Sequence, residues 1–229
     1  MISQQGQLEL FRLIGSSLNQ DVTCYAFGGN AMMFYGYKGE TKDVDLLFED
    51  EENRREFIRV IKLLGYEESS PFKIYIEEKL REKHRPLMFK RQDDNGRFDL
   101  FVKKIFRTLL SPRMQEDVYA EHEFNEKNKL KVKVLRKEQL VILKSVTDRQ
   151  NDFDDIKTII KQDKHFDWQY LIDEVFWQHR HGDTWVLLDV EEMLKELKKY
   201  VLVPEKFVRQ LYGMNRDKLR LAPKKKAKN

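Results

Sequence analysis

The sequence predicts an α+β protein, with a sheet and flanking helices over residues 1–134 and a helical region over 135–221. Short apolar segments that end at glycine or turn residues fill the first part, as buried strands would. Segments with apolar residues at helical spacing alternate with them. Beyond Lys137 the helical pattern continues with few Gly or Pro residues, which favours a helical C-terminal domain.

The elements of the first part follow from these patterns. Apolar residues from Leu8 to Leu18 share one face of a helix predicted over 3–19. We expect strands at 22–27, 43–48, 72–76, 86–90, 97–102 and 129–135, and helices over 30–35 and 51–64. The run from Asp93 to Gly96 predicts a hairpin turn between strands 86–90 and 97–102. The charged stretch from Glu77 to Arg85 is expected to form a helix or an exposed loop.

The second part is read as a series of helices. They are expected over 137–149, 153–162, 167–180, 184–200 and 204–213. Aromatic residues recur in this part at near-helical spacing: Phe166, Trp168, Tyr170, Phe176, Trp177 and Trp185. We interpret them as core or contact residues of the helical domain, the alternative being a base-stacking platform.

The positive charge of the chain belongs to its C-terminal tail. Charged residues make up 36% of the sequence, and the formal net charge is +4. Four lysines in the segment 222–229 account for this excess, so the rest of the chain has no overall basic character. We expect the tail to be a disordered, solubilising end; the alternative is an arm that binds nucleic acid.

Other features indicate a cytoplasmic protein of undetermined oligomeric state. No apolar run is long enough to cross a membrane, and the first residues lack the pattern of a signal peptide. The single cysteine, Cys24, excludes an intrachain disulfide and is expected to be buried and structural. His179 and His181 lack a third metal ligand at a recognisable spacing and are expected at the surface.

Two acidic residues stand out in the predicted strand 43–48. Asp43 and Asp45 are separated only by Val44, so strand alternation directs both carboxylates to the same face. Like charges held side by side repel, and a cation would relieve that repulsion. Oxygen ligands favour Mg²⁺ carried with substrate phosphates, with Mn²⁺ as the alternative metal. The competing interpretation is a solvated pair on an exposed strand edge.

The surrounding residues favour the metal site. Gly28-Gly29-Asn30 ends one strand and opens a helix, where backbone N–H groups can approach phosphate closely. Asp99 is the inward polar residue of another apolar strand, and an acid there is costly without a partner. Three carboxylates on neighbouring strands could hold two metal ions, with Asp99 as the candidate general base.

These residues resemble the polymerase-beta-like nucleotidyltransferase superfamily. The match comprises Gly28-Gly29-Asn30, Asp43-Val44-Asp45 and Asp99 on a later strand. The segment 41–47 is similar to the minimal branch of that superfamily, which includes the AbiEii-type toxins of toxin–antitoxin systems. The segment 143–156, with Lys144, Arg149, Asp152 and Asp155, resembles the helical segment that follows the core in those proteins. The resemblance covers roughly residues 22–156.

The resemblance implies a nucleotidyltransferase fold and a role for each matching residue. Asp43, Asp45 and Asp99 would bind metal and carry catalysis. The residues implied in nucleotide binding are Gly28, Gly29, Asn30, Thr41, Lys42, Lys144, Arg149, Asp152 and Asp155. Many members of the superfamily carry Ser where this chain has Asn30, an amide that can also donate to phosphate. Taken alone, Lys144 would instead be read as part of a solvated helix face.

The leading hypothesis is a metal-dependent enzyme that moves a nucleoside monophosphate from an NTP, ATP among them, to a hydroxyl acceptor. The acceptor could be a protein side chain, an RNA 3′ end or a small molecule, and the protein could serve as a toxin. The main alternative keeps the fold without the chemistry, as a binding module or antitoxin-type scaffold. A third alternative is a nucleic-acid-binding regulator that uses the basic tail and the helical part.

Overall fold

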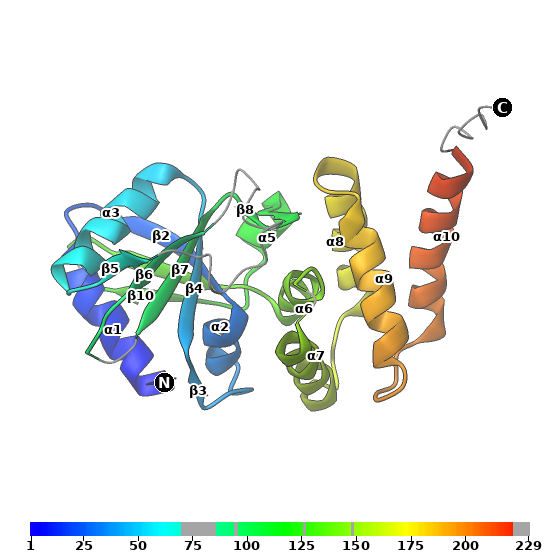
Figure 1. Cartoon of the computed structure of the whole chain (residues 1–229), viewed down its shortest axis with the longest axis horizontal. Helices are drawn as coiled ribbons and strands as arrows, with labels where there is room; N and C mark the ends of the chain where they lie inside the picture. Colours follow the sequence, from blue (N-terminus) through cyan, green and yellow to red (C-terminus); the bar gives the residue numbers. More distant parts are fainter. Residues whose placement is uncertain (70–85, 94–95, 126, 148, 222–229) are drawn as a thin grey trace.

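The structure confirms the α+β class, with a mixed sheet and flanking helices followed by a helical C-terminal part (Figure 1). It is a computed structural model that describes residues 1–69, 86–93, 96–125, 127–147 and 149–221, with side chains up to residue 216. The expected strand 72–76, the charged stretch 77–85 and the basic tail lie outside these residues. The division into two domains near residue 134 stays a prediction.

The described part of the chain forms one large mixed sheet in the strand order β10-β11-β2-β4-β7-β6-β5. The strands are β2 (Val22–Phe27), β4 (Asp43–Phe48), β5 (Glu67–Ser69), β6 (Leu87–Lys90), β7 (Arg97–Val102), β10 (Ala120–Phe124) and β11 (Leu130–Val134), with the short β8 (Lys104–Ile105) and β9 (Thr108–Leu109) continuing from β7. The pairs β11–β2 and β4–β7 are parallel, and the other pairs are antiparallel. The predicted hairpin is present as β6 and β7, in which Phe89 faces Phe98.

Helices of the first part hold this sheet in place. They are α1 (Gln4–Ser16), α2 (Gly28–Phe34), α3 (Glu51–Leu63) and α5 (Pro112–Glu116); β1 (Ile2–Ser3) pairs with β3 (Glu40–Thr41) beside them. α1 and α3 pack against each other and against the sheet, whereas α2 packs against β2, β4 and the helical part. α3 begins where the Asp50 side chain accepts a hydrogen bond from the Asn53 N–H at 2.8 Å, with Glu51 and Glu52 in its first turn.

The sheet core is built from apolar strands buried on both faces. In β4, Val44 and Leu46 are fully buried, and β2 is buried along most of its length. Phe98 of β7 packs edge-on against Phe57 of α3, with ring centroids 5.5 Å apart. Such strands carry little conformational freedom, so side chains at their ends are placed by the backbone register.

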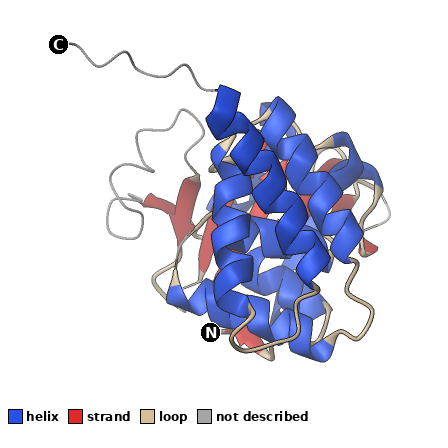
Figure 2. Cartoon of the chain, turned by 90° about the vertical axis from the view of Figure 1, so that its right-hand side faces the viewer, coloured by secondary structure: helices blue, strands red, loops and turns tan. Residues whose placement is uncertain are grey.

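The helical part covers one side of the sheet. It consists of α6 (Lys137–Ser145), α7 (Gln150–Gln162), α8 (Trp168–His181), α9 (Trp185–Leu197) and α10 (Glu205–Leu221). Viewed from that side, these helices stand in front of the strands (Figure 2). α6 is the central helix, because it packs against α2 as well as α7, α8 and α9. It therefore connects the helical part to the sheet. None of the described helices is both long and apolar enough to traverse a bilayer.

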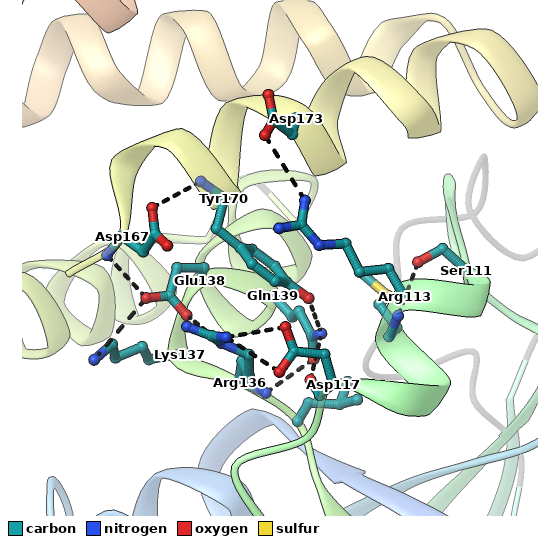
Figure 3. Close-up of polar contacts among 12 residues, drawn as sticks. Ser111, Arg113, Asp117, Arg136, Lys137, Glu138, Gln139, Asp167, Tyr170 and Asp173 are labelled. Carbon is teal, nitrogen blue, oxygen red and sulfur yellow. Dashed lines mark hydrogen bonds and ion pairs between the residues drawn. The ribbon is translucent and has the colours of Figure 1, made fainter.

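A polar network fixes the joint between the two parts (Figure 3). The Arg136 guanidinium donates to both oxygens of Asp117, at 2.9 and 3.1 Å. Gln139 donates to the Tyr170 hydroxyl at 2.7 Å, and the Tyr170 ring lies between Arg136 and Arg113. Glu138, fully buried, accepts from the Asp167 N–H at 3.0 Å. Charge-assisted and buried hydrogen bonds of this kind hold α6 and α8 at a set orientation to the end of the sheet.

The structure adds β5, α5 and the short strands β1, β3, β8 and β9 to the expected elements. Three further differences have a physical reason. β10 was not predicted, because this short edge strand contains two glutamates and a histidine and so leaves little apolar signal. α6 ends at Ser145 rather than at Arg149. At this end the Ser145 hydroxyl donates to the Val141 carbonyl, and the Thr147 hydroxyl donates to the Lys144 carbonyl. Trp185 is 57% exposed beneath Arg107 and so is not a core residue, whereas Phe166 and Tyr170 are buried as expected.

Replacement of Phe98 tests the core between the sheet and α3. Phe98→Ala removes a fully buried ring and leaves a cavity against Phe57, so we expect the free energy of unfolding to fall by about 3–5 kcal/mol. Urea denaturation would measure this loss. Leu63→Ala, at a side chain that is 70% exposed, should change stability by less than about 0.5 kcal/mol. Similar losses in both variants would contradict the assignment of Phe98 to the core.

Candidate active site

The site begins with the parallel pairing of β4 and β7. In this register Asp43 lies opposite Arg97, and Asp45 lies opposite Asp99. On the other side of β4, Phe27 of β2 pairs with Asp45, so the chain that leaves β2 at Gly28 starts beside the carboxylates. Adjacent strands lie about 4.8 Å apart. The three predicted acids are therefore neighbours at one end of the sheet.

The glycine turn is shaped around the acidic pair. Gly28 has φ +63°, a left-handed conformation that glycine adopts without strain. A Cβ atom built on Gly28 would lie 2.2 Å from Oδ2 of Asp45, and one on Gly29 would lie 2.5 Å from Oγ1 of Thr41. Any larger residue at either position would displace these side chains. The two glycines thus leave space directly over Asp45 and Thr41.

A cleft of about 290 Å³ opens in front of the pair and combines residues from both parts of the chain. Its lining includes Gly28, Gly29, Lys38, Glu40, Thr41, Lys42, Asp43, Asp45, Lys144, Arg149, Asn151, Asp152 and Asp155. One wall comes from the sheet and its glycine turn, and the other comes from α6 and α7. Most of the predicted site residues therefore meet in one place, although the two motifs are about a hundred positions apart in the sequence.

Electrostatics at the acidic pair favours a cation. Burial, followed by repulsion from Asp99 and Asp43, raises the pKa of Asp45 to about 7. Burial also raises the pKa of Asp43, against the opposing effect of Arg97. A divalent cation would offset this repulsion, and two carboxylates that open on a cleft are suitable oxygen ligands for it. Asp43 and Asp45 therefore fit the metal that the sequence predicts.

Asp99 is placed differently from the other two acids. Its side chain is buried and does not line the cleft. The Arg97 guanidinium contacts it twice, with Nε 3.0 Å from Oδ1 and Nη2 3.2 Å from Oδ2, and it also forms an ion pair with Asp43. Across the described ranges, no cluster of three or more His, Cys, Asp or Glu residues is arranged to hold a metal ion. The metal and base roles of Asp99 stay predictions.

The opposite wall carries basic residues held by acids. Lys144 is only 7% exposed, and its Nζ lies 2.8 Å from Asp152 and 2.7 Å from Asp155. Lys38, from the loop after α2, reaches Asp155 at 2.6 Å, and Arg149 reaches Asp152 at 2.6 Å. Burial disfavours ionisation of Asp152, but Lys144 and Arg149 outweigh that effect and lower its pKa. Lys144 thus faces the cleft and is not part of a solvated helix face.

Of the remaining residues predicted to bind nucleotide, Asn30 and Thr41 have hydrogen-bond partners within the chain. Asn30 is buried, and its amide oxygen accepts from the Asp45 N–H at 3.2 Å, so this residue supports the acidic strand from behind. The Thr41 hydroxyl donates to the backbone oxygen of Asp43 at 3.2 Å. Lys42 is exposed at the rim. Among these residues, Lys42 is therefore best placed to meet a ligand entering the cleft.

Two cations that pair with the predicted acids, Arg97 and Lys38, were not predicted from the sequence. Arg97 could have been found, because strand alternation places it on the same face as Asp99. Lys38 gave no such signal, since it lies in an irregular loop between Gly36 and Gly39 and meets Asp155 only through the tertiary fold. The histidine pair is peripheral as expected, with His181 exposed at the end of α8. Cys24 is buried, and burial raises the pKa of its thiol.

A second hollow of about 410 Å³ adjoins the cleft on the far side of Lys144 and Arg149. α7 contributes Gln150, Phe153 and Ile156 to it, and α9 contributes Asp189, Glu192, Met193 and Glu196. Tyr200 closes it beyond α9. Lys144 and Arg149 therefore line both hollows.

Comparisons with known proteins give only remote similarities. No protein-family model and no curated protein matches the sequence. Among solved structures, JHP933 from Helicobacter pylori is similar at 13% identity with a TM-score of 0.41, over 95% of this chain and 100% of that chain. A second H. pylori structure, described as a "putative nucleotidyltransferase", is similar at 13% identity with a TM-score of 0.40, over 93% and 94% of the two chains. Similarity this remote carries no argument about function.

The raised pKa of Asp45 predicts a pH-dependent stability. The pKa of Asp45 is higher in the folded than in the unfolded chain. Its contribution to the free energy of unfolding is therefore complete below about pH 4 and is lost as the pH rises through 7. Asp45→Asn removes the ionising group. In urea denaturation without metal, we expect the variant to be more stable than the natural chain by up to about 4 kcal/mol at pH 8 and equal to it near pH 4. The same difference at both pH values would contradict this interpretation.

Replacement of Gly28 tests the close approach of the turn to Asp45. Gly28→Ala places a Cβ atom against Oδ2 of Asp45 and strains a positive φ, so we expect a loss of about 2 kcal/mol in unfolding free energy. Gly39→Ala is the matched control, because nothing lies within 4 Å of a Cβ atom there. Its stability should stay within about 0.5 kcal/mol of the natural chain. Thermal unfolding of both variants would decide, and equal losses would rule out the steric argument.

Proposed function

We propose that this chain is a metal-dependent nucleotidyltransferase that moves a nucleoside monophosphate from an NTP to a hydroxyl acceptor. One observation carries the proposal: the Asp43–Asp45 pair opens on a cleft whose other sides are the Gly28-Gly29 turn and the basic wall around Lys144. Paired acids suit a divalent cation, and a glycine turn with cations opposite suits a polyphosphate. A single cleft with both features suits a metal–triphosphate complex.

The roles proposed for the residues follow from their positions. Asp43 and Asp45 would hold Mg²⁺, or Mn²⁺ in its place, and the ion would neutralise charge on the phosphates. Gly28 and Gly29 would let the triphosphate lie close to the backbone. Lys42 and Arg149, the more exposed cations, would contact phosphate oxygens. Lys144 would contribute its charge from its position between Asp152 and Asp155.

The reaction proposed is an in-line displacement at the α-phosphorus. The acceptor oxygen forms a bond to phosphorus, the bond to the β,γ-diphosphate breaks, and pyrophosphate leaves. The acceptor proton passes to a carboxylate base. Asp99, which lies opposite Asp45 in the β4–β7 pairing, is the candidate base, because Asp43 and Asp45 are committed to the metal. The hollow between α7 and α9 provides room for an acceptor beside the nucleotide.

A binding module without chemistry is the second candidate. The observation that favours it is the engagement of Arg97 with both Asp43 and Asp99, which occupies two of the three acids with an internal partner. Such a protein would bind NTP or a partner protein and release no pyrophosphate. Calorimetry with NTP and Mg²⁺ separates the two, because a scaffold should bind equally well without the acids. Service as a toxin is a further proposal, tested by growth arrest on expression that Asp43→Ala relieves.

The proposed function predicts that label transfer depends on the acidic pair. With each α-labelled NTP, Mg²⁺ and cell extract, we expect the natural chain to label one class of macromolecule or small molecule. Asp43→Ala and Asp45→Ala should reduce this transfer at least about a hundredfold, because the metal loses its ligands. Asp154→Ala is the control, since this exposed acid on α7 pairs only with Lys157 among the described residues. Undiminished transfer by correctly folded Asp43→Ala and Asp45→Ala would refute the assignment.

A further inference from the structure

The contact that most constrains the acidic site is made by Arg97. Its side chain is 14% exposed, and it connects Asp43, at the edge of the cleft, with the buried Asp99. Both contacts follow from strand register, because Arg97 lies directly across from Asp43 and two positions before Asp99 on the same face of β7. The guanidinium is therefore fixed at this place by the sheet itself.

A guanidinium here affects a divalent cation in two ways. It carries a permanent positive charge next to Asp43 and Asp45, which repels a second cation at any pH at which the protein is folded. It also donates to carboxylate oxygens of Asp43 and Asp99 that a metal would otherwise use. Both effects reduce the affinity of the acidic site for metal. Neither depends on the basic wall, whose cations are held by Asp152 and Asp155.

We propose that Arg97 is a built-in competitor of the metal: it takes the place of a second cation between Asp43 and Asp99 and keeps the nucleotide-free site weak for divalent ions. The inference rests on the proposed function only in taking a divalent ion as the partner of Asp43 and Asp45. Metal would then enter mainly with the triphosphate, because phosphate oxygens replace the carboxylate oxygens that Arg97 contacts. The acidic site would therefore bind little metal when no substrate is present.

The test is a titration of the full chain with Mn²⁺ alone, read from the electron paramagnetic resonance signal of the free ion. Arg97→Gln removes the competing charge beside Asp43, so its Mn²⁺ dissociation constant should fall at least about tenfold relative to the natural chain. Arg59→Gln is the matched control, because Arg59 forms a comparable pair with Glu56 on α3. Its Mn²⁺ affinity should stay within about twofold of the natural chain.

A second variant covers the case in which Arg97→Gln fails to fold. Arg97→Lys keeps a charge but loses the planar fork that contacts both acids, so a smaller gain of about threefold is expected. An affinity for Mn²⁺ equal to or weaker than that of the natural chain, in a folded variant of either kind, overturns the proposal.

Repeating the titration with NTP separates this inference from the proposed function. If the natural chain takes up Mn²⁺ with NTP but Arg97→Gln gains nothing without it, the role of Arg97 is wrong and the proposed function is unaffected. If no form of the chain takes up Mn²⁺ with or without NTP, the metal-dependent function fails, and this inference fails with it.

Discussion

The site depends on the parallel pairing of β4 with β7. That pairing sets Asp45 against Asp99 and Asp43 against Arg97, and the antiparallel pairing of β2 with β4 brings Gly28 beside the same carboxylates. A shift of one residue in either register would turn these side chains to the opposite face of the sheet. The apolar residues between them, Val44 and Leu46, prevent such a shift because they fill the core. The core residues therefore position the polar ones.

Charge compensation is the second organising feature of the cleft. Arg97 contacts two acids, Lys144 contacts two acids, and Asp155 is shared by Lys144 and Lys38. Partly buried charges are costly unless they are paired. Among the residues that the structure describes, Asp45 forms no ion pair, and burial followed by repulsion from Asp99 and Asp43 raises its pKa. The charges around the cleft therefore nearly cancel, except at Asp45, the acid nearest the glycine turn.

The helical part contributes the other half of the site through α6 and α7. Lys144 reaches the cleft because α6 is anchored at its beginning, where Arg136 holds Asp117 and Gln139 holds Tyr170 (Figure 3). From that anchor, α6 runs past α2 and delivers its last turn to the acids of α7. Lys38 fastens the loop after α2 to the same acids. The width of the cleft therefore depends on contacts at both ends of α6.

The sequence by itself determined the α+β class, the order of the main strands and helices, and the residues that line most of the cleft. These follow from local rules: apolar periodicity, glycine at a positive φ, and alternation along a strand, which paired Asp43 with Asp45. These rules did not predict the edge strand β10, because its two glutamates and a histidine leave little apolar signal. Only the tertiary structure decided that Asn30 supports Asp45 from behind, that Lys38 reaches Asp155, and that Arg97 occupies Asp43 and Asp99. These contacts depend on which strands become neighbours in the sheet and on how the loop after α2 folds back. Contacts between segments far apart in the sequence produce no periodic pattern of residues, so they could not be predicted.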